Sequence, residues 1–252
     1  MRVLVTRSRE QAGTLADALL AIGAEPVYLP VIKIMPVKDC PELDGAIQEL
    51  ECYDWLVLTS ANAVRVVFDR MGDLGIQNLP GNLRTAVIGP STAAVLEERG
   101  FSPDFMPGEY IAEAVVTGLG ELKGRQVLLP TADIASDTLP GAIQAADGIP
   151  HVITVYHTLP AEPDPEGLEA LRIGVDVITF TSGSTARNFY RMVEGAGINP
   201  LSLPGKPRIA CIGPKTKAEA ERIGFRVDIQ PEQYTTRGLV EAITQIKVRN
   251  NP

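Results

Sequence analysis

Short runs of consecutive apolar residues alternate along the chain with longer segments in which apolar residues recur every three or four positions. The short runs predict buried β-strands at 3–5, 24–28, 55–58, 85–88, 126–129, 152–156 and 209–212. The spacing of Ala12, Leu15, Ala16 and Leu19 is typical of the amphipathic helices expected between them. Apolar strands that alternate with helices indicate parallel sheets covered by helices on both faces, so we expect an α/β fold.

Several residues mark where the predicted helices begin and end. Thr59 or Ser60 is expected to cap the helix that contains Val64 and Val67. Pro90 suits the first position of a helix, and Gly224 suits a left-handed residue after the end of one. Helices are also predicted over 43–50 and 112–119.

The second half of the chain repeats the first. Gly213 lies in the motif I-G-P-K-T and corresponds to Gly89 in I-G-P-S-T, 124 residues earlier. At the same offset, residues 14–34 align with 138–158 without a gap, whereas the motifs T-S-A-N-A-V and T-S-G-S-T-A are 122 residues apart. A repeat of this length predicts two similar domains, because a solenoid needs shorter and more numerous units.

Two linker-like segments occupy equivalent places in the two copies. Residues 30–35 form an extended stretch that ends at Pro36, and residues 160–165 are rich in proline and charge. If each segment crosses between the domains, one domain is discontinuous and contains both termini.

The composition and net charge limit the kinds of molecule that the protein is expected to bind. The 252 residues can bury two cores of ordinary size, and 45% hydrophobic with 21% charged residues is an ordinary soluble composition. The net charge of −8 argues against a nucleic acid or an anionic membrane as partner, although backbone dipoles can still hold a small acidic ligand. No stretch reaches the roughly 20 apolar residues of a membrane span.

The cysteines and the first residues suggest a location. Cys40, Cys52 and Cys211 are widely spaced and form no C-x-x-C motif, which favours a reduced, cytoplasmic protein. The first residues, MRVLVTRSREQ, become charged at once and lack the apolar core of a secretion signal.

Standard catalytic motifs are absent from the sequence. It contains no G-x-x-x-x-G-K-[ST], no G-x-G-x-x-G, no H-E-x-x-H and no zinc-type spacing of Cys and His. His151 and His157 are its two histidines, so a metal site or a Ser/His/Asp triad has little support. We expect no cofactor and no metal.

Candidate binding residues lie where predicted strands run into predicted helices. In parallel sheets such junctions gather at the carboxyl ends of the strands, and unpaired N–H groups at helix starts attract anions. Several junctions together could hold a ligand with many carboxylates, although each could simply cap its helix, because Ser, Thr and Pro are preferred there. The candidates are Arg7, Ser60, Ala61, Asn62, Gly89, Ser91, Thr92, Ser182, Gly183, Ser184, Gly213, Lys215 and Thr216.

Several other side chains are candidates for either a structural or a functional role. Tyr156, at the second predicted crossing, could donate a proton to a leaving hydroxyl or merely pack, and its position alone favours packing. We interpret His157 as a solvent-facing linker residue and not as a base. Tyr110 and Tyr234 each precede a helix, where packing and ligand contact are equally plausible. Arg7, Lys33, Arg187 and Lys215 are the cationic candidates for carboxylate contacts.

An ordered set of motifs resembles the uroporphyrinogen-III synthase family. The set spans nearly the full chain, and its members are V-T-R at Val5, T-S-A-N-A-V at Thr59, I-G-P-S-T at Ile88, V-Y-H-T at Val155, F-T-S-G-S-T at Phe180, I-G-P-K-T at Ile212 and Y-T-T-R-G-L at Tyr234. Each motif alone is weak, but their order and spacing together are fairly specific. One departure is Gly183, where a proline is common in the family.

This resemblance implies an α/β fold with two similar flavodoxin-like lobes, whose parallel sheets are joined by a two-stranded β-ladder linker. Lobe 1 would comprise 1–34 and 161–252, lobe 2 would comprise 37–154, and the linker strands would be 30–36 and 155–160. The active site is expected in the cleft between the lobes.

The resemblance also implies a reaction. The substrate would be hydroxymethylbilane, a linear tetrapyrrole with acetate and propionate side chains, received from the preceding pathway enzyme. The protein, expected to be a monomer, would remove the terminal hydroxyl, invert ring D and close the macrocycle as a hydro-lyase without a cofactor. Tyr156 matches the family tyrosine that assists departure of the hydroxyl, and Ser60, Thr92, Ser182 and Thr216 match positions at the cleft.

Two other functions compete with this reading. A cytoplasmic two-lobed small-molecule binding protein would share the doubly crossed architecture, but as a sensor it would usually carry an output module, and the sequence shows none. An enzyme that uses a dinucleotide or nucleotide sugar is disfavoured because the glycine fingerprint is missing.

Overall fold

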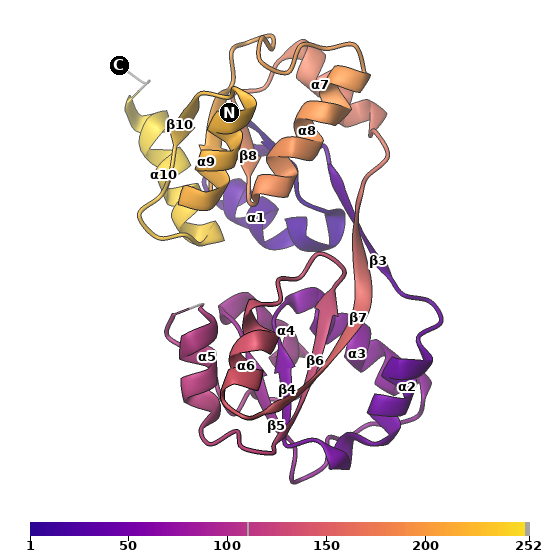
Figure 1. The fold of residues 1–252 in the computed structure, drawn as a ribbon. Helices are drawn as coiled ribbons and strands as arrows, with labels where there is room; N and C mark the ends of the chain where they lie inside the picture. Colours follow the sequence, from indigo (N-terminus) through magenta and orange to yellow (C-terminus); the bar gives the residue numbers. More distant parts are fainter. Residues whose placement is uncertain (110, 250–252) are drawn as a thin grey trace. The chain divides into compact units, whose positions relative to one another are not determined.

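A computed structural model describes residues 1–109 and 111–249 of the protein (Figure 1). The chain forms two compact units, here called lobe 1 (Met1–Lys33 with Leu159–Pro252) and lobe 2 (Ile34–Thr158). It passes from one lobe to the other within strands β3 (Ile32–Pro36) and β7 (Ile149–Pro160), which pair with each other. Tyr110, one of the two tyrosines expected before a helix, lies outside the described residues.

Lobe 1 is built on a parallel sheet with the strand order β10-β9-β8-β1-β2. Its strands are β1 (Arg2–Val5), β2 (Glu25–Tyr28), β8 (Val177–Phe180), β9 (Arg208–Cys211) and β10 (Val227–Ile229). Counted along the chain within this lobe, the spatial order is 2-1-3-4-5, which is the order of flavodoxin-like folds. Ligands of such sheets bind beside the strand at which the order reverses, here between β1 and β8.

Both faces of this sheet are covered because successive side chains of a strand point to opposite faces. Val3 and Val5 pack with residues of α1 (Arg9–Ala21) and α10 (Thr236–Arg249). Leu4, between them, packs on the other face with residues of α7 (Pro165–Ile173), α8 (Gly183–Gly195) and α9 (Pro214–Ile223). The apolar strand patterns follow from this double burial.

Lobe 2 repeats the arrangement with the strand order β3-β7-β6-β4-β5. Its further strands are β4 (Trp55–Leu58), β5 (Arg84–Val87) and β6 (Gln126–Ala132), and the pairs β5/β4, β4/β6 and β6/β7 are parallel. Trp55 and Val57 lie in a core with residues of α5 (Ala112–Leu119) and α6 (Thr138–Ala145). Leu56 and Leu58 lie in a second core with residues of α2 (Pro41–Gln48), α3 (Ala61–Asp73), α4 (Pro90–Glu98) and the short 3-10 helix Leu50–Cys52.

The duplication explains the two crossings. At the sequence offsets of the repeat, β6, β7, β4 and β5 correspond to β1, β2, β8 and β9, and a parallel bridge between Ala86 and Phe105 stands where β10 lies in lobe 1. Lobe 1 therefore takes β1 and β2 from the first copy and β8 to β10 from the second, whereas lobe 2 takes β4 and β5 from the first copy and β6 and β7 from the second. Such an exchange requires the chain to cross twice. The expected α/β fold with two similar flavodoxin-like lobes is confirmed.

Some predicted boundaries were wrong. Strand β7 begins at Ile149 and not at Val152. A proline is expected at the boundary of a strand, because it lacks the N–H group that a strand ladder needs. In the structure Pro150 lies in register opposite Val127. Helix α2 also begins earlier than expected, because Pro41 occupies its first turn.

The predicted helix signals are confirmed. Gly224 adopts the left-handed conformation after α9, with φ of 111°, and Pro90 stands at the start of α4. The Ser60 side chain accepts a hydrogen bond from Ala63 N–H and so caps α3.

The cysteines and helices add two observations. Cys40, Cys52 and Cys211 are all unpaired, and burial raises the pKa of the Cys211 thiol to about 12. Within the described ranges, no helix has the length and apolar character needed to cross a membrane.

Candidate active site

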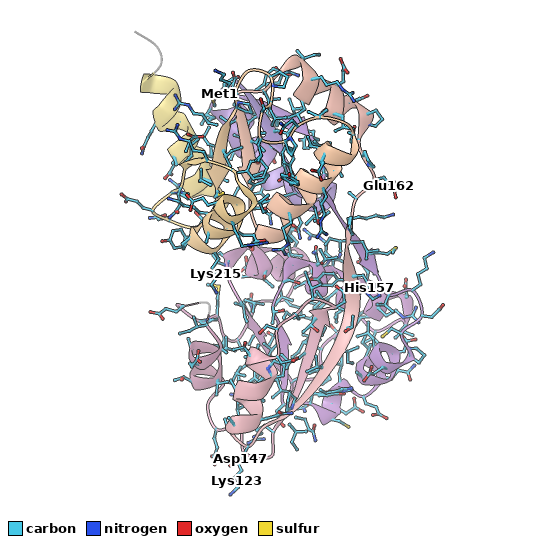
Figure 2. All side chains as sticks on the ribbon, turned by 45° about the horizontal axis from the view of Figure 1, so that its top comes forward. Met1, Lys123, Asp147, His157, Glu162 and Lys215 are labelled. Atoms are coloured by element: carbon cyan, nitrogen blue, oxygen red, sulfur yellow. The ribbon has the colours of Figure 1, made fainter. Side chains whose placement is uncertain are left out.

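The predicted junction residues lie at the carboxyl ends of the strands in each lobe. In lobe 1, Figure 2 shows Lys215, at the start of α9, at the opposite end from Met1, which precedes β1. In lobe 2 it shows His157, in β7, at the opposite end from Lys123 and Asp147, which precede β6 and β7. Each lobe thus gathers its strand-to-helix junctions at one edge, where ligands of such sheets bind.

Tyr156 and Ser60 form the central pair of the lobe 2 edge. The two hydroxyl oxygens are 3.0 Å apart, and the Tyr156 residue is 6% exposed. Ser60 Oγ also accepts a hydrogen bond from Ala63 N–H at 3.1 Å, as the cap of α3. The serine proton can therefore be donated to the tyrosine oxygen, which leaves the phenol proton available to another acceptor.

This pair can support transfer of the phenol proton. Tyr156 lies one hydrogen bond from the start of α3, where the helix dipole favours negative charge. When the proton leaves, the Ser60 hydroxyl and the helix dipole would both stabilise the charge that develops on the phenol oxygen. Lobe 2 thus holds a phenol that could donate a proton at the edge where its strands end.

Asp133 and His157 complete the surroundings of Tyr156, and Asp133 was not among the residues predicted from the sequence. Asp133 follows β6, and its Oδ2 lies 3.0 Å from His157 Nδ1. Its Oδ1 accepts a hydrogen bond from Thr158 N–H at 3.1 Å, and its own N–H donates to the Tyr156 carbonyl at 3.1 Å. The repeat aligns strand β6 with β1, and Ser136 and Thr138 stand before and at the start of α6, so both signals could have drawn attention to this junction. His157, expected to be a linker residue facing solvent, lies in β7, the strand in which the chain crosses between the lobes. Its side chain is 43% exposed and is also bonded to Asp133.

The junction after β5 serves mainly to shape the backbone. Gly89 has φ of 92°, in the left-handed region, so glycine is needed to turn the chain from β5 into α4. Thr92 is 2% exposed and donates its hydroxyl to the Ile88 carbonyl at 3.3 Å. Ser91, in contrast, is exposed at the start of α4.

In lobe 1, Arg7 follows β1 at the point where the strand order reverses. Thr6 Oγ1 donates to the Thr179 carbonyl at 2.6 Å, and Thr179 Oγ1 donates to the Leu4 carbonyl at 2.8 Å, so β1 and β8 are tied side by side. Arg7 donates to Gln11 at 3.3 Å. Burial lowers the pKa of its guanidinium, which still remains cationic at neutral pH.

Ser182 and Ser184 present hydroxyls at the start of α8. Ser182 Oγ accepts from Thr185 N–H at 3.2 Å, and Thr185 Oγ1 accepts from Ser182 N–H at 3.2 Å, which forms a reciprocal cap. The hydroxyls of Ser182 and Ser184 are 2.9 Å apart. Both residues are partly exposed, so this helix start can offer hydroxyls to an anion.

The junction after β9 carries Lys215 and Tyr234. Lys215 is exposed in the first turn of α9 and makes no ion pair with any residue that the structure describes. The ring of Tyr234 lies over Gly213, where an added Cβ would be 3.4 Å from its Cγ, and Tyr234 is 58% exposed. An exposed cation and an exposed aromatic ring thus stand beside one helix start.

Comparison with known proteins identifies the family. A family model described as "Uroporphyrinogen-III synthase HemD" matches residues 13–241. The chain is 32% identical over 248 residues to a uroporphyrinogen-III synthase of Synechococcus elongatus, covering 96% of this chain and 94% of the relative. It is also 30% identical over 250 residues to one of Chlorobaculum parvum, covering 96% and 98%. The chain belongs to the uroporphyrinogen-III synthase family.

Solved structures of the family share the fold. A mutant uroporphyrinogen III synthase of Thermus thermophilus matches with a TM-score of 0.63 at 18% identity, covering 99% of this chain and 100% of that one. The Helicobacter pylori enzyme also gives 0.63, at 16% identity, covering 97% and 98%. The resemblance seen in the sequence is therefore confirmed, and the protein belongs to tetrapyrrole biosynthesis.

The departure from the family pattern at Gly183 has a local cause. A Cβ atom at this position would lie 3.0 Å from Cγ and 3.1 Å from Cβ of Glu219 in α9. Helix α9 therefore approaches the start of α8 closely, and glycine is the residue that leaves room for it.

One cationic candidate for carboxylate contacts is already engaged. Arg187 Nη1 lies 2.7 Å from Glu219 Oε1, and Arg222 Nη2 lies 2.8 Å from the same oxygen. Hydrogen bonds from Arg222 and Arg187 lower the pKa of Glu219 to about 2, so this carboxylate is ionised and holds both cations. Arg187 therefore ties α8 to α9, and its contact with substrate carboxylates stays a prediction.

Burial separates the remaining candidates. Asn62, Thr92 and Thr216 are 5%, 2% and 5% exposed, so their side chains shape the helix starts from within. Gly89 and Gly213 are also buried, and Ser60, Ala61, Ser182, Gly183 and Ser184 are partly exposed. The partly exposed residues, together with the exposed Ser91 and Lys215, are therefore the candidates whose side chains or backbone a ligand could reach.

Two cavities of lobe 1 can be compared with these junctions. One of about 620 Å³ is lined by Ile32 and Lys33 but also by Glu162, Asp164 and Glu166, a surplus of carboxylates that disfavours an anionic ligand. Another of about 430 Å³ lies near the amino ends of β9 and β10, away from the junctions. Neither suits the carboxylates of a tetrapyrrole.

Proposed function

We propose that the protein converts hydroxymethylbilane into uroporphyrinogen III, with loss of water and inversion of ring D. In this proposal it is a hydro-lyase that needs no cofactor and acts as a monomer in the cytoplasm, where its three unpaired cysteines stay reduced. Its substrate would arrive from the enzyme that precedes it in the pathway. Family membership supports the reaction class, and the pair of Tyr156 and Ser60 is the observation that carries the chemistry.

The first step breaks the bond between the terminal methylene carbon and its hydroxyl oxygen. The pyrrole nitrogen lone pair drives the hydroxyl out, and the Tyr156 phenol supplies the proton with which it leaves as water. Ring D then attacks through its substituted carbon to form a spiro intermediate, which reopens with the ring inverted and closes the macrocycle. The proton that the ring loses in closure balances the one supplied, so no oxidant or reductant is required.

Most of the catalysis is then positioning. The electron-rich pyrrole expels the hydroxyl readily, and the enzyme must hold the chain so that inversion outruns direct closure to the unrearranged type I isomer. Holding reactive ends in a near-attack geometry contributes by removing their translational and rotational freedom. The junction residues bind the acetate and propionate groups for this purpose.

The charges of the two copies favour a division of labour between the lobes. Arg7, Lys33 and Lys215 of lobe 1 correspond at the repeat offset to Thr131, His157 and Ser91 of lobe 2. Lobe 1 thus carries cations suited to carboxylates, whereas lobe 2 carries the tyrosine that donates the proton. We propose that lobe 1 binds most of the substrate carboxylates and that lobe 2 acts on the departing hydroxyl.

Replacing Lys215 by methionine tests the binding half of the proposal. The change removes the exposed cation at the start of α9 and should raise KM for hydroxymethylbilane about fivefold, while kcat changes by less than about twofold. The effect should shrink as salt is added, because screening weakens exposed charges. Steady-state kinetics at two ionic strengths would measure it.

Lys217→Met is the matched control for this variant. It removes the same charge from the same helix, two residues further on, where Lys217 already lies 3.9 Å from Glu221. An equal rise of KM in both variants would show that net charge, and not a contact at Lys215, governs binding.

A further inference from the structure

Asp133 holds strand β7 at Tyr156 and at the two residues that follow it. Its N–H donates to the Tyr156 carbonyl at 3.1 Å, and its Oδ1 accepts from Thr158 N–H at 3.1 Å. Its Oδ2 lies 3.0 Å from Nδ1 of His157, the residue that follows the tyrosine. A single residue therefore bonds to the tyrosine itself and to the next two residues.

The strand needs such support at this point. The pairing of β6 with β7 shifts register between Thr131 and Ala132, and Ala132 lies opposite Tyr156. A bulge interrupts the regular ladder and re-aims the side chains beside it, so the ladder alone does not fix the direction of the tyrosine. The bonds from Asp133 begin immediately after this irregularity.

The Asp133 carboxylate is suited to this role because it is ionised. Burial alone would raise its pKa, but hydrogen bonds from Thr158 N–H and from His157 lower the pKa of Asp133 below its usual range. An ionised carboxylate only accepts hydrogen bonds, so His157 Nδ1 must carry the proton between them. Because the pKa of Asp133 is lower in the folded than in the unfolded protein, its hydrogen bonds stabilise the fold at neutral pH. That stabilisation is lost as the pH falls through the folded-state pKa.

The other lobe shows that the fold itself does not require this arrangement. At the repeat offset Tyr156 and His157 correspond to Ile32 and Lys33, and Asp133 corresponds to an arginine of the sequence. The three equivalent positions of lobe 1 therefore carry no carboxylate, imidazole or phenol. The set in lobe 2 occurs together with the tyrosine to which the chemistry is assigned.

We propose that Asp133 is a positioning residue for Tyr156, which aims the phenol at the departing hydroxyl by fixing the backbone of residues 156–158. This inference rests on the proposed function of Tyr156. Asp133 does not touch the reacting atoms in this account, and its effect on the rate passes through the tyrosine.

A double-mutant cycle tests the proposal with kinetics of the full chain. Asp133→Ala should lower kcat about tenfold when Tyr156 is present, but less than about twofold in the Tyr156→Phe background, because coupled residues are not additive. KM should change less than about threefold, since the carboxylate binds no substrate. Asp133→Asn, which keeps an acceptor for Thr158 N–H, should recover part of the rate and replaces the alanine variant in the cycle if that variant does not fold.

Asp54→Ala is the matched control. Asp54 also ties strand β6, accepting from Gln126 N–H at 2.9 Å and from Arg125 Nη1 at 2.6 Å, but it does so at the amino end of the strand. Its loss should lower the urea midpoint about as much as the loss of Asp133, with kcat unchanged.

The outcomes distinguish a failure of the role given to Asp133 from a failure of the proposed function. An equal fall of kcat in both tyrosine backgrounds, or an equal fall in Asp54→Ala, would overturn the positioning role of Asp133. A wild-type protein that makes no type III isomer would instead overturn the proposed function on which this role rests.

Discussion

Tyr156→Phe is expected to lower kcat between about tenfold and a hundredfold while KM stays nearly constant. The phenylalanine keeps the ring in its buried place but removes the hydroxyl that lies 3.0 Å from Ser60 Oγ. The loss remains moderate because the electron-rich pyrrole still expels its hydroxyl, with water as the alternative proton donor. Steady-state assays with hydroxymethylbilane would give both constants.

Tyr53→Phe provides the control for this prediction. Tyr53 is also a buried tyrosine of lobe 2 with a bonded hydroxyl, 2.6 Å from His151 Nδ1, but it precedes β4 at the other end of the sheet. It should lose similar stability and keep its activity. A loss above about a thousandfold in Tyr156→Phe, about 4 kcal/mol in the barrier, would mean that one group dominates the catalysis and would contradict the positioning account.

Phe180→Ala is expected to destabilise lobe 1 by about 4 kcal/mol, because a fully buried aromatic ring leaves a cavity when it is truncated. The Phe180 ring lies 5.4 Å from that of Phe189 and 5.3 Å from that of Phe225, centroid to centroid. The three rings join β8 to α8 and to the segment after α9. Urea unfolding followed by circular dichroism would measure the loss.

The location of the effect is also part of this prediction. Trp55, the single tryptophan, lies in the core of lobe 2, so its fluorescence reports on the unfolding of that lobe. Hydrogen exchange of lobe 1 peptides would measure the loss of stability in lobe 1. Ile173→Ala, at a residue 70% exposed, should change the free energy of unfolding by no more than about 0.5 kcal/mol. Equal losses in the two variants would show that the ring cluster is not a main support of lobe 1.

The sequence predicted the features that depend on local pattern or on the repeat. Strands that are apolar throughout, such as 3–5 and 55–58, could be recognised because both faces of each sheet are covered. The cap at Ser60, the turn at Gly224 and the start at Pro90 follow from backbone chemistry within a few residues. The repeat supplied the two similar lobes.

What the sequence could not predict depends on contacts between distant segments. Ser60 and Tyr156 are 96 residues apart, and nothing local shows that their hydroxyls meet. The pairing of Arg187 with Glu219, 32 residues away, depends on how closely α9 packs against α8. Asp133 was missed because its role lies in its bonds to β7, whereas the junction candidates were recognised by Ser and Thr at helix starts.

The most direct test of the account is an isomer assay. Hydroxymethylbilane would be generated in place by the preceding enzyme, with and without this protein, and the oxidised porphyrins separated. We expect type III to predominate with the protein and type I to predominate without it. Type I alone, from protein shown to be folded, would contradict the proposed reaction and would favour a two-lobed binding protein.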